Sequence, residues 1–524
     1  MFIRFFSVLG SCILMTLAGC GFSSVREPGA IYIHLAAEPG TLNPIISIDS
    51  SETTINTYIQ ENLIRRDNDT LDFVPQLAEK WDISSDKLGY TFYLKKGILW
   101  HDGVELTADD IIYSYRVIMD PTTDDASLRI YYQDVDQIRK IDKYTVYFHF
   151  RKQYYRALEI CGGMQIIPKH IFDSNGSINN HPWNRHPIGT GPYIFKEWKT
   201  GQSITLVRNE KYWGKIPEIR KIVFRIVPEN KVAFKMMKKG ELDYMVIRPI
   251  QWTRQTSGWK FNSEFNKIKY YTPNFSYIGW NNAREPFNDK RVRRAMTMLV
   301  NREKLGKKLF YDLTINVSGP FYINGPDYDQ TIKPLPYDPD GAKKLLAEAG
   351  WKDSDGDGYL DRNGKPFSFV MTLSSGSPSA DRIATILKED LSHVGIKMEI
   401  ERYEWAVFLE KITKKKFDAT YLAWSLGFDS DPYQIWHSSS IDSSGSNNIS
   451  YRNPKIDQLC DLIRLTYDVS KRREYYHEFH RIIAEDQPYT FMFCSPSLVT
   501  ISKRFGNVKV HSAGLDLTEW TVEK

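Results

Sequence analysis

Apolar residues recur at helical spacing in several parts of the chain, each time after a residue that can cap a helix. The stretch KRVRRAMTMLV (290–300) follows Asp289, and its apolar side chains fall at i, i+3, i+4 and i+7. This spacing places them on one face of a helix that packs against a core. The positions are Val292, Ala295, Met296 and Leu299.

Local start and stop signals predict further helices. Thr107 and Asp110 form a capping-box variant before IIYSYRVIM, in which each residue satisfies a free backbone N–H of the first turn. Proline suits the first helical turn and glycine ends helices. On these grounds Asp338-Pro339 opens a helix that stops at Gly350, and Asn453-Pro454 opens another. One more helix is predicted in REYYHEFHRIIAED, before Pro488.

Between these helices lie short runs rich in β-branched and aromatic residues, which predict strands. They are YTFYLKKG (90–97), TVYFHF (145–150), SITLVRN (203–209), KIVFRIV (221–227) and FSFVMTLSS (367–375). Mixed strands and helices predict α/β lobes. With 524 residues the chain is too long for one ordinary core, so two or three lobes are expected.

Composition narrows the class of protein. Hydrophobic residues make up 42% and charged residues 25%, as in an ordinary globular protein, which excludes disorder on a large scale. The formal net charge is +5. The sequence has no basic tail and no long run of one charge, so nothing indicates a nucleic-acid partner.

The first twenty residues, MFIRFFSVLGSCILMTLAGC, predict an exported lipoprotein. Arg4 precedes a run from Phe5 to Leu17 that is almost wholly apolar but short for a membrane span. Leu17-Ala18-Gly19-Cys20 resembles the bacterial lipobox. We therefore predict a signal peptide at 1–19, lipidation of Cys20 and a tether at 20–28. The alternative is an ordinary cleaved signal beside a chance cysteine.

Three cysteines remain in the predicted mature chain beyond Cys20, so at most one disulfide can form, and no CxxC spacing indicates zinc. Enzyme motifs are equally scarce. In His477-Glu478-Phe479-His480 the second histidine comes one position too early for a zinc protease, and a solvated helix face is the expected explanation. The stretch Gly189-Thr190-Gly191-Pro192 is expected to form a tight turn. No enzymatic activity is predicted.

The stretch DSDGDGYLD (353–361) has the acidic spacing of an EF-hand loop but not its bidentate last ligand, because the twelfth position is Gly364. A strand follows where an EF-hand has its second helix. We interpret it as an exposed helix-to-strand loop, with a weak structural calcium as the one cofactor to be tested. The metal ligands would be Asp353, Asp355, Asp357 and Asp361.

Several blocks, taken in order, resemble the solute-binding proteins of bacterial peptide ABC importers, the oligopeptide- and dipeptide-binding lipoproteins of family 5. The resemblance covers nearly all of the predicted mature chain. The longest block is VPQLAEKWDISSD…YTFYLKKGILWHDGVELTADDIIYSYR (74–116). The others are EPGTLNP (38–44), PIGTGPYIFKEWKTGQSITLVRNEKYWG (187–214), KGELDYMV (239–246), NDKRVRRAMTMLVNREKL (288–305), YDPDGAKKLLAEAGW (337–351) and RNPKIDQLCDLI…DQP (452–488).

This resemblance implies a two-lobed α/β binding protein of the large three-domain peptide-binding type. Lobe I would comprise 29–69, 187–275 and 489–524. A smaller domain would be inserted at 70–186, and lobe II would comprise 276–488. Two crossover segments, near 270–280 and 485–492, would form the hinge, and the cleft would close on its ligand.

The resemblance also implies where an extended peptide would lie. Its main chain would bond to Ala37, Glu38 and Pro39 in lobe I and to 423–426 in lobe II, as an added strand would. The lobe II residues are Ala423, Trp424, Ser425 and Leu426.

Here the sequence departs from the best-known members, which carry an aspartate three residues after the tryptophan. This chain has Gly427 there and continues as SLGFDSDP, the pattern of a side branch. Asp429, with Asp431 beside it, is predicted to hold the ligand's α-ammonium. The alternative makes both aspartates turn formers before Pro432, and makes Trp424 a core residue rather than a wall of the cleft.

The predicted function is capture of short peptides and delivery to an ABC permease by a lipid-anchored monomer. It would act in the periplasm or on the outer face of the cell membrane. The same scaffold serves other solutes, so glutathione, a murein peptide, a nickel chelate, an opine or a sugar remain alternatives. A membrane-anchored hydrolase and a ligand-sensing partner of a receptor are alternatives from other classes.

Overall fold

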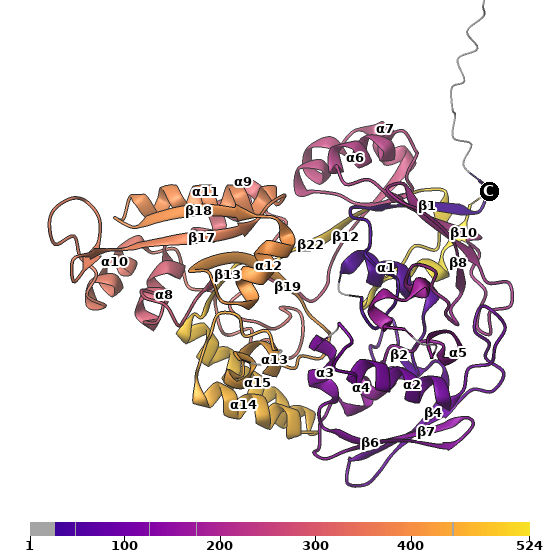
Figure 1. Cartoon of the computed structure of the whole chain (residues 1–524). Helices are drawn as coiled ribbons and strands as arrows, with labels where there is room; N and C mark the ends of the chain where they lie inside the picture. The colour runs from indigo at the N-terminus through magenta and orange to yellow at the C-terminus, as the bar shows by residue number, and fades with distance from the viewer. Residues whose placement is uncertain (1–26, 48, 125, 174–175, 443–444, 524) are drawn as a thin grey trace, which may run out of the picture.

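The computed structural model describes residues 27–47, 49–124, 126–173, 176–442 and 445–523 (Figure 1). The predicted signal peptide, Cys20 and most of the tether lie outside these residues. Within the described part, no helix combines the length and apolar character that a membrane span needs. The chain forms two lobes on either side of β12 and β22, with an inserted domain beneath lobe I in this view.

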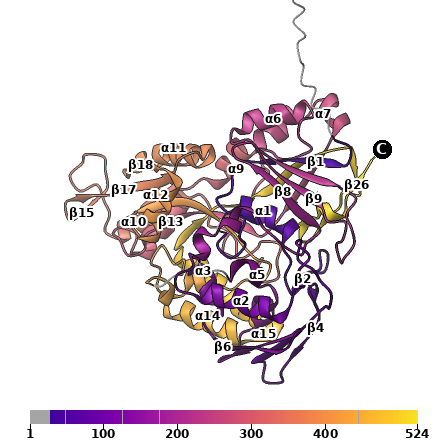
Figure 2. The same ribbon diagram turned by 45° about the vertical axis from the view of Figure 1, so that its right-hand side comes forward.

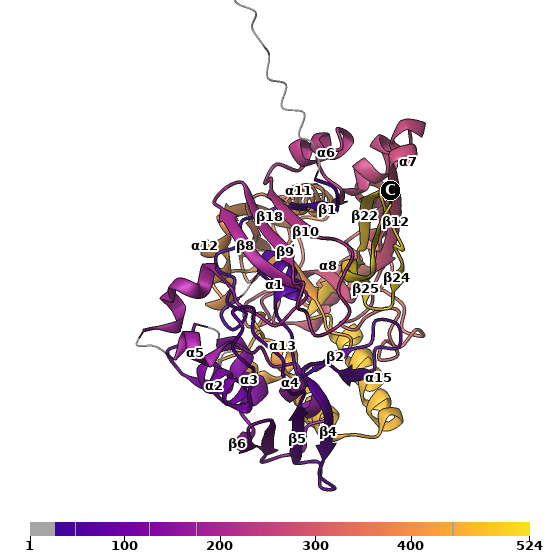
Figure 3. The same ribbon diagram turned by 90° about the vertical axis from the view of Figure 1, so that its right-hand side faces the viewer.

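Lobe I is built on a seven-stranded mixed sheet in the order β12-β22-β11-β1-β10-β9-β8. β1 runs parallel to both β10 and β11, and the other neighbours are antiparallel. Figure 3 shows β8, β9 and β10 side by side above the inserted domain. The strands are β1 (Ala30–Leu35), β8 (Tyr193–Lys199), β9 (Ser203–Arg208), β10 (Lys221–Ile226), β11 (Tyr244–Val246), β12 (Phe265–Tyr271) and β22 (Pro496–Ser502); the helices are α1 (Ser50–Ile59), α6 (Asn230–Lys238) and α7 (Trp259–Glu264), with short C-terminal strands β23 (Phe505–Gly506), β24 (Val510–His511), β25 (Gly514–Leu515) and β26 (Thr521–Val522).

The inserted domain has a four-stranded antiparallel sheet in the order β4-β5-β7-β6. The predicted capping box forms: Thr107 and Asp110 satisfy each other's backbone N–H at the start of α2. The core also takes in Ile45, Leu63 and Ile64, so the domain begins before the predicted residue 70. Its elements are β2 (Ile64–Arg66), β3 (Phe73–Pro75), β4 (Ala78–Ile83), β5 (Gly89–Leu94), α2 (Ala108–Met119), α3 (Ala126–Tyr132), β6 (Val135–Asp142), β7 (Thr145–Phe150), α4 (Ala157–Gly162) and α5 (Lys169–Phe172).

Lobe II surrounds a second mixed sheet in the order β18-β17-β19-β13-β20. The predicted amphipathic helix is α8, whose Val292, Ala295 and Met296 are fully buried. The strands are β13 (Asn274–Trp280), β14 (Ile315–Asn316), β15 (Asp361–Arg362), β16 (Lys365–Pro366), β17 (Ser368–Ser374), β18 (Lys397–Tyr403), β19 (Ala419–Ser425), β20 (Tyr489–Phe491) and β21 (Phe493–Cys494). The helices are α8 (Lys290–Met298), α9 (Arg302–Phe310), α10 (Pro339–Glu348), α11 (Pro378–Ser392), α12 (Trp405–Thr413), α13 (Tyr433–Trp436), α14 (Pro454–Leu465) and α15 (Val469–Asp486).

The chain passes between the lobes twice, at 272–273 and at Ser495. Residues 489–491 bond to β13, and 493–494 bond to β14, so they belong to lobe II. The boundary predicted at 488 therefore moves to Ser495, because strand pairing and not the end of α15 decides the lobe. Cys161, Cys460 and Cys494 are all buried free thiols.

Candidate functional site

In both lobes the parallel strands end at a common edge of the sheet. In lobe I, β1 is flanked by the parallel strands β10 and β11. In lobe II, β17 is parallel to β18 and β19. Open α/β sheets bind ligands at the carboxyl ends of their strands, where the connecting loops leave a crevice. Residues 37–39 follow β1 and 423–426 end β19, so both predicted contact segments lie at these edges.

The lobe I segment is anchored through Glu38. Its carboxylate accepts hydrogen bonds from Trp198 Nε1 at 2.7 Å and from the backbone N–H of Gly201 at 3.0 Å. Ala37 is exposed and Pro39 is buried. Because the Glu38 side chain is bonded to β8 and to the turn after it, the exposed Ala37 and the backbone of this segment are left to meet a ligand.

In lobe II, Ala423 and Ser425 are exposed, whereas Trp424 between them is partly buried. The Trp424 ring stacks on Tyr277 with 6.4 Å between centroids, and it packs against the core of the lobe. Leu426 donates its N–H to the carbonyl of Pro273 at 2.9 Å. Trp424 thus packs on the core and keeps part of its surface exposed, and its role as a wall of the cleft stays a prediction.

One edge of β19 is largely free. Residues Asn274–Trp280 of β13 pair with all of β19 on one side. On the other side β17 bonds to β19 only at Ala419 and Thr420. From 421 to 425, no other described strand pairs with this side of β19. Unpaired N–H and C=O groups of this kind can accept an added strand.

Asp429 does not stand free in the cleft. Its carboxylate lies 2.5 Å from Nη2 of Arg66, and the same guanidinium lies 3.1 Å from Glu159. Arg66 comes from β2 and Glu159 from α4, so this ion pair joins lobe II to the inserted domain. The Asp429 side chain remains 42% exposed. Its predicted role as partner of a ligand ammonium stays a prediction, in competition with Arg66.

Asp431 is a buried residue whose carboxylate is fully used by contacts within the protein. Its side chain is 0% exposed and lies 2.8 Å from the Arg464 guanidinium. The hydroxyl of Tyr154, from the inserted domain, donates to it at 2.7 Å. Burial alone would raise the pKa of Asp431, but the charge and hydrogen bonds of Arg464 hold that pKa below its ordinary value. We therefore correct the prediction for Asp431, which has no free oxygen at a ligand surface.

A third carboxylate, Asp327, has no counterpart in the sequence-based prediction. It makes no hydrogen bond or ion pair with the residues that the structure describes. Burial, and next the negative charge of Asp429, raise the pKa of Asp327 from 3.8 to about 7. A carboxyl group with so perturbed a pKa is a candidate for a functional site. No sequence motif marks it, since only the fold brings it near Asp429.

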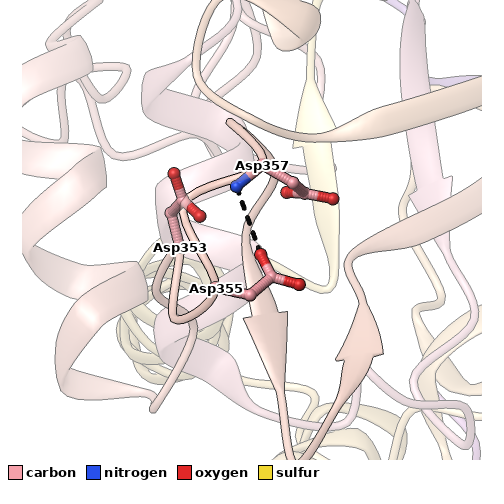
Figure 4. Close-up of side chains that lie close together, drawn as sticks. All are labelled: Asp353, Asp355 and Asp357. Atoms are coloured by element: carbon pink, nitrogen blue, oxygen red, sulfur yellow. Dashed lines mark hydrogen bonds between the residues drawn. The ribbon is translucent and has the colours of Figure 1, made fainter.

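The acidic loop lies between α10 and β17, as predicted. Carboxylate oxygens of Asp353, Asp355 and Asp357 lie within 4.8 Å of one another and are exposed (Figure 4). Asp361 is not in this group, and its carboxylate accepts hydrogen bonds from the backbone N–H and the hydroxyl of Ser354. Calcium binding by this loop stays a prediction, and the three grouped aspartates also accept backbone N–H groups of their own loop.

The two histidines of the HEFH stretch differ. His477 is partly exposed and lies 3.2 Å from the carbonyl of Pro326, but His480 is 0% exposed. His480 lies 3.0 Å from the hydroxyl of Ser318, and its Nδ1 accepts the N–H of Asp329 at 3.2 Å. Burial lowers the pKa of His480 to about 4. The prediction of a solvated face was therefore wrong for His480, which is a neutral core residue.

Comparison with known proteins places this geometry in a family. The sequence profile of "Bacterial extracellular solute-binding proteins, family 5 Middle" matches residues 72–446. The oligopeptide-binding protein AppA of Bacillus subtilis is 31% identical over 93% of this chain and 90% of its own length. The dipeptide-binding protein of Escherichia coli is 24% identical over 91% and 90%.

Comparison with solved structures supports the same family. AppA from Bacillus subtilis in complex with a nonapeptide has a TM-score of 0.85 and 29% identity, covering 95% of this chain and all of that one. NikZ from Campylobacter jejuni in complex with Ni(L-His) has a TM-score of 0.82 at 24% identity, over 94% and 99%, which shows the fold alone. Proteins of this class bind solutes and catalyse no reaction. The chain belongs to the bacterial extracellular solute-binding proteins of family 5.

Proposed function

We propose that this protein captures short peptides, extended between its two lobes, and delivers them to an ABC import permease. Its family is extracellular and non-enzymatic, and the relatives named above include an oligopeptide-binding and a dipeptide-binding protein. We further propose a monomer held to the membrane by lipid at Cys20.

The observation that carries the proposal is the free edge of β19. An extended peptide laid along 421–425 would gain main-chain hydrogen bonds whatever its side chains are. Ala423 and Ser425 carry small, exposed side chains, so they hinder a neighbouring chain little. Affinity from main-chain bonds and tolerance of sequence are what a carrier of many peptides needs.

Titration calorimetry tests the capture of peptides. Protein freed of co-purified ligand should give saturable heat with peptides of three to nine residues and none with a sugar or an opine. Glutathione and a nickel–histidine chelate belong in the same series, because they represent the alternative solutes. Absence of heat with every peptide would overturn the proposal.

The role of Asp429 needs a second experiment, because its ion pair with Arg66 offers two explanations for any loss. If Asp429 holds the ligand ammonium, Asp429→Ala weakens binding of a free peptide by about 10-fold or more. N-acetylation of the peptide should cost as much, and the two changes should not add.

Arg66→Met is the matched variant, since it breaks the same interdomain pair and leaves the carboxylate. Direct amine binding predicts unchanged or tighter peptide affinity in Arg66→Met. Equal losses in Asp429→Ala and Arg66→Met would show that the pair only joins the domains, and the amine site would move to another carboxylate such as Asp327.

Anchoring and delivery are tested in cells. Cys20→Ser should release the protein from the membrane fraction and remove the mass of a diacylglyceryl group from the mature N-terminus. A strain without the protein should lose uptake of a labelled peptide, and the wild-type gene should restore it. An unchanged N-terminal mass in the Cys20→Ser variant, apart from the substitution itself, would contradict the lipid anchor.

A further inference from the structure

A cavity of about 710 Å³ lies between the lobes, at the same carboxyl edges as the predicted contact segments. This size is typical of a ligand site. Its lobe I wall consists of α6, which follows β10, and of residues 248–255, which follow β11. Its lobe II wall consists of the end of α9 and of residues 376–382, which follow β17. Figures 1 and 2 show α6 across from α9 and α11.

The side chains that line this cavity are strongly positive. Its lining includes six cationic side chains and no Asp or Glu. All six residues are exposed, and none forms a salt bridge with another described residue. Gathered in one cavity, they repel one another and attract anions. They are Lys231, Lys235, Lys238, Arg248, Lys308 and Arg382.

The remaining lining suits a chain with apolar atoms between charged groups. Phe234, Ile250 and Phe310 line the cavity from both lobes. The guanidinium of Arg254, in lobe I, lies 5.8 Å from the ring centre of Tyr311 in lobe II, a cation–π contact across the cavity region. A ligand here would therefore contact both lobes at once.

The start of α11 adds to the positive potential. This helix has 15 residues, and its N-cap Ser377 makes no side-chain capping bond. Its first N–H groups are thus not satisfied by that side chain, and the helix dipole is positive at this end. Ser377 and Ser379 both line the cavity, so the helix start and the six cations act on the same space.

We propose that this cavity receives the acidic part of the ligand and that the protein selects peptides carrying two or more carboxylates. The inference rests on the proposed function, since it names the peptides that the cleft prefers. Main-chain hydrogen bonds along β19 would not depend on the sequence of the peptide. The cationic cavity would in addition discriminate between peptides by their charge.

Calorimetry with matched heptapeptides tests the inference at low salt. One peptide carries adjacent Asp and Glu residues, and its partner carries Asn and Gln at the same places. Wild-type protein should bind the acidic peptide at least 10-fold more tightly. Moving the acidic pair along the peptide should change this preference, because the six cations line the cavity beside α6, α9 and α11 and not the segment 423–426.

The variant Lys231→Gln/Lys235→Gln/Lys308→Gln should reduce the preference to below 3-fold and leave the affinity for the amide peptide unchanged. Lys196→Gln/Lys215→Gln/Lys503→Gln is the matched control, because it removes the same charge from exposed lysines outside the cavity. The control should keep the full preference.

Equal binding of the two peptides by wild-type protein would overturn the inference and leave peptide capture intact. Loss of the preference in the control would also overturn it, because net charge would then be the cause. Citrate binding as tight as that of the acidic peptide would overturn it as well, by making the cavity a general anion site. Failure of both peptides to bind would instead refute the proposed function.

Discussion

Two regions where the lobes approach each other use charge in opposite ways. At the contact between the inserted domain and lobe II, Asp431, Arg464 and Tyr154 satisfy one another in a buried group. At the cationic cavity, six exposed positive side chains have no described acidic partner. The first arrangement holds parts of the protein together, because each charge is already matched. The second is open to a partner from outside.

The largest expected effect on the free energy of unfolding comes from breaking the buried group of Asp431, Arg464 and Tyr154. Arg464→Met leaves Asp431 buried without its cation, which typically costs about 3–5 kcal/mol of unfolding free energy. Chemical denaturation measures it. Arg452→Met, which removes an exposed pair with Asp442, should change stability little. A similar small change for Arg464→Met would show that the contact is solvated in solution.

Substitution of Asp327 is expected to have the next largest effect on the free energy of unfolding, and the size of this effect depends on pH. Its folded pKa of about 7 lies above the ordinary 3.8, so the folded state binds the proton more tightly. Its stabilising contribution is complete below pH 3.8 and is lost as pH rises through 7. Asp327→Asn should therefore stabilise the protein at pH 8 by about 1–3 kcal/mol, after allowance for partial exposure, and not at pH 4.

Denaturation curves at the two pH values measure this difference. Asp329→Asn is the control, because Asp329 accepts hydrogen bonds from Thr331 that lower its pKa. That variant should destabilise the protein at pH 8. The same sign for both variants would contradict the assignment of Asp327 as an unmatched carboxylate.

The buried group and the cationic cavity should respond differently to ionic strength. Raising salt from about 0.02 to 0.5 M screens exposed charges far more than buried ones. The preference for acidic peptides should fall several-fold, whereas the stability cost of Arg464→Met should stay nearly constant. Calorimetry and denaturation at both salt concentrations measure the two quantities. Parallel changes would remove the distinction between the regions.

The acidic loop is a third group of charges, exposed and outside both regions, and its expected effect is the smallest. A weak calcium site occupied to half would add about 0.4 kcal/mol, a shift in melting temperature of a degree or less. Asp353→Asn/Asp357→Asn should abolish that shift. No shift of wild-type protein in millimolar calcium would remove the calcium prediction.

Local signals explain what could be predicted from the sequence. The capping box of α2, the proline starts of α10 and α14, and the apolar face of α8 all depend on residues within a few positions. Such signals fix an element before the rest of the chain is known. The boundaries of the lobes were predicted less accurately than the helices, because they depend on which strands pair.

The site was harder to predict because its charges are distant in sequence. Arg66 and Asp429 are 363 positions apart, and no pattern near Asp429 announces its partner. Lys231, Lys235 and Lys238 share one face of α6, but no helix was predicted there from the sequence. Arg248 joins them through the fold of lobe I, and Lys308 and Arg382 join them only because lobe II meets lobe I, so the cavity could not be seen in the sequence.

The order of strands in lobe I has a consequence for biogenesis. β22, near the end of the chain, lies between β12 and β11, and β11 joins it to β1 at the beginning. The first lobe therefore cannot be completed until about residue 502 has emerged. A chain that ends before β22 would leave β11 and β12 without the strand that joins them in the sheet.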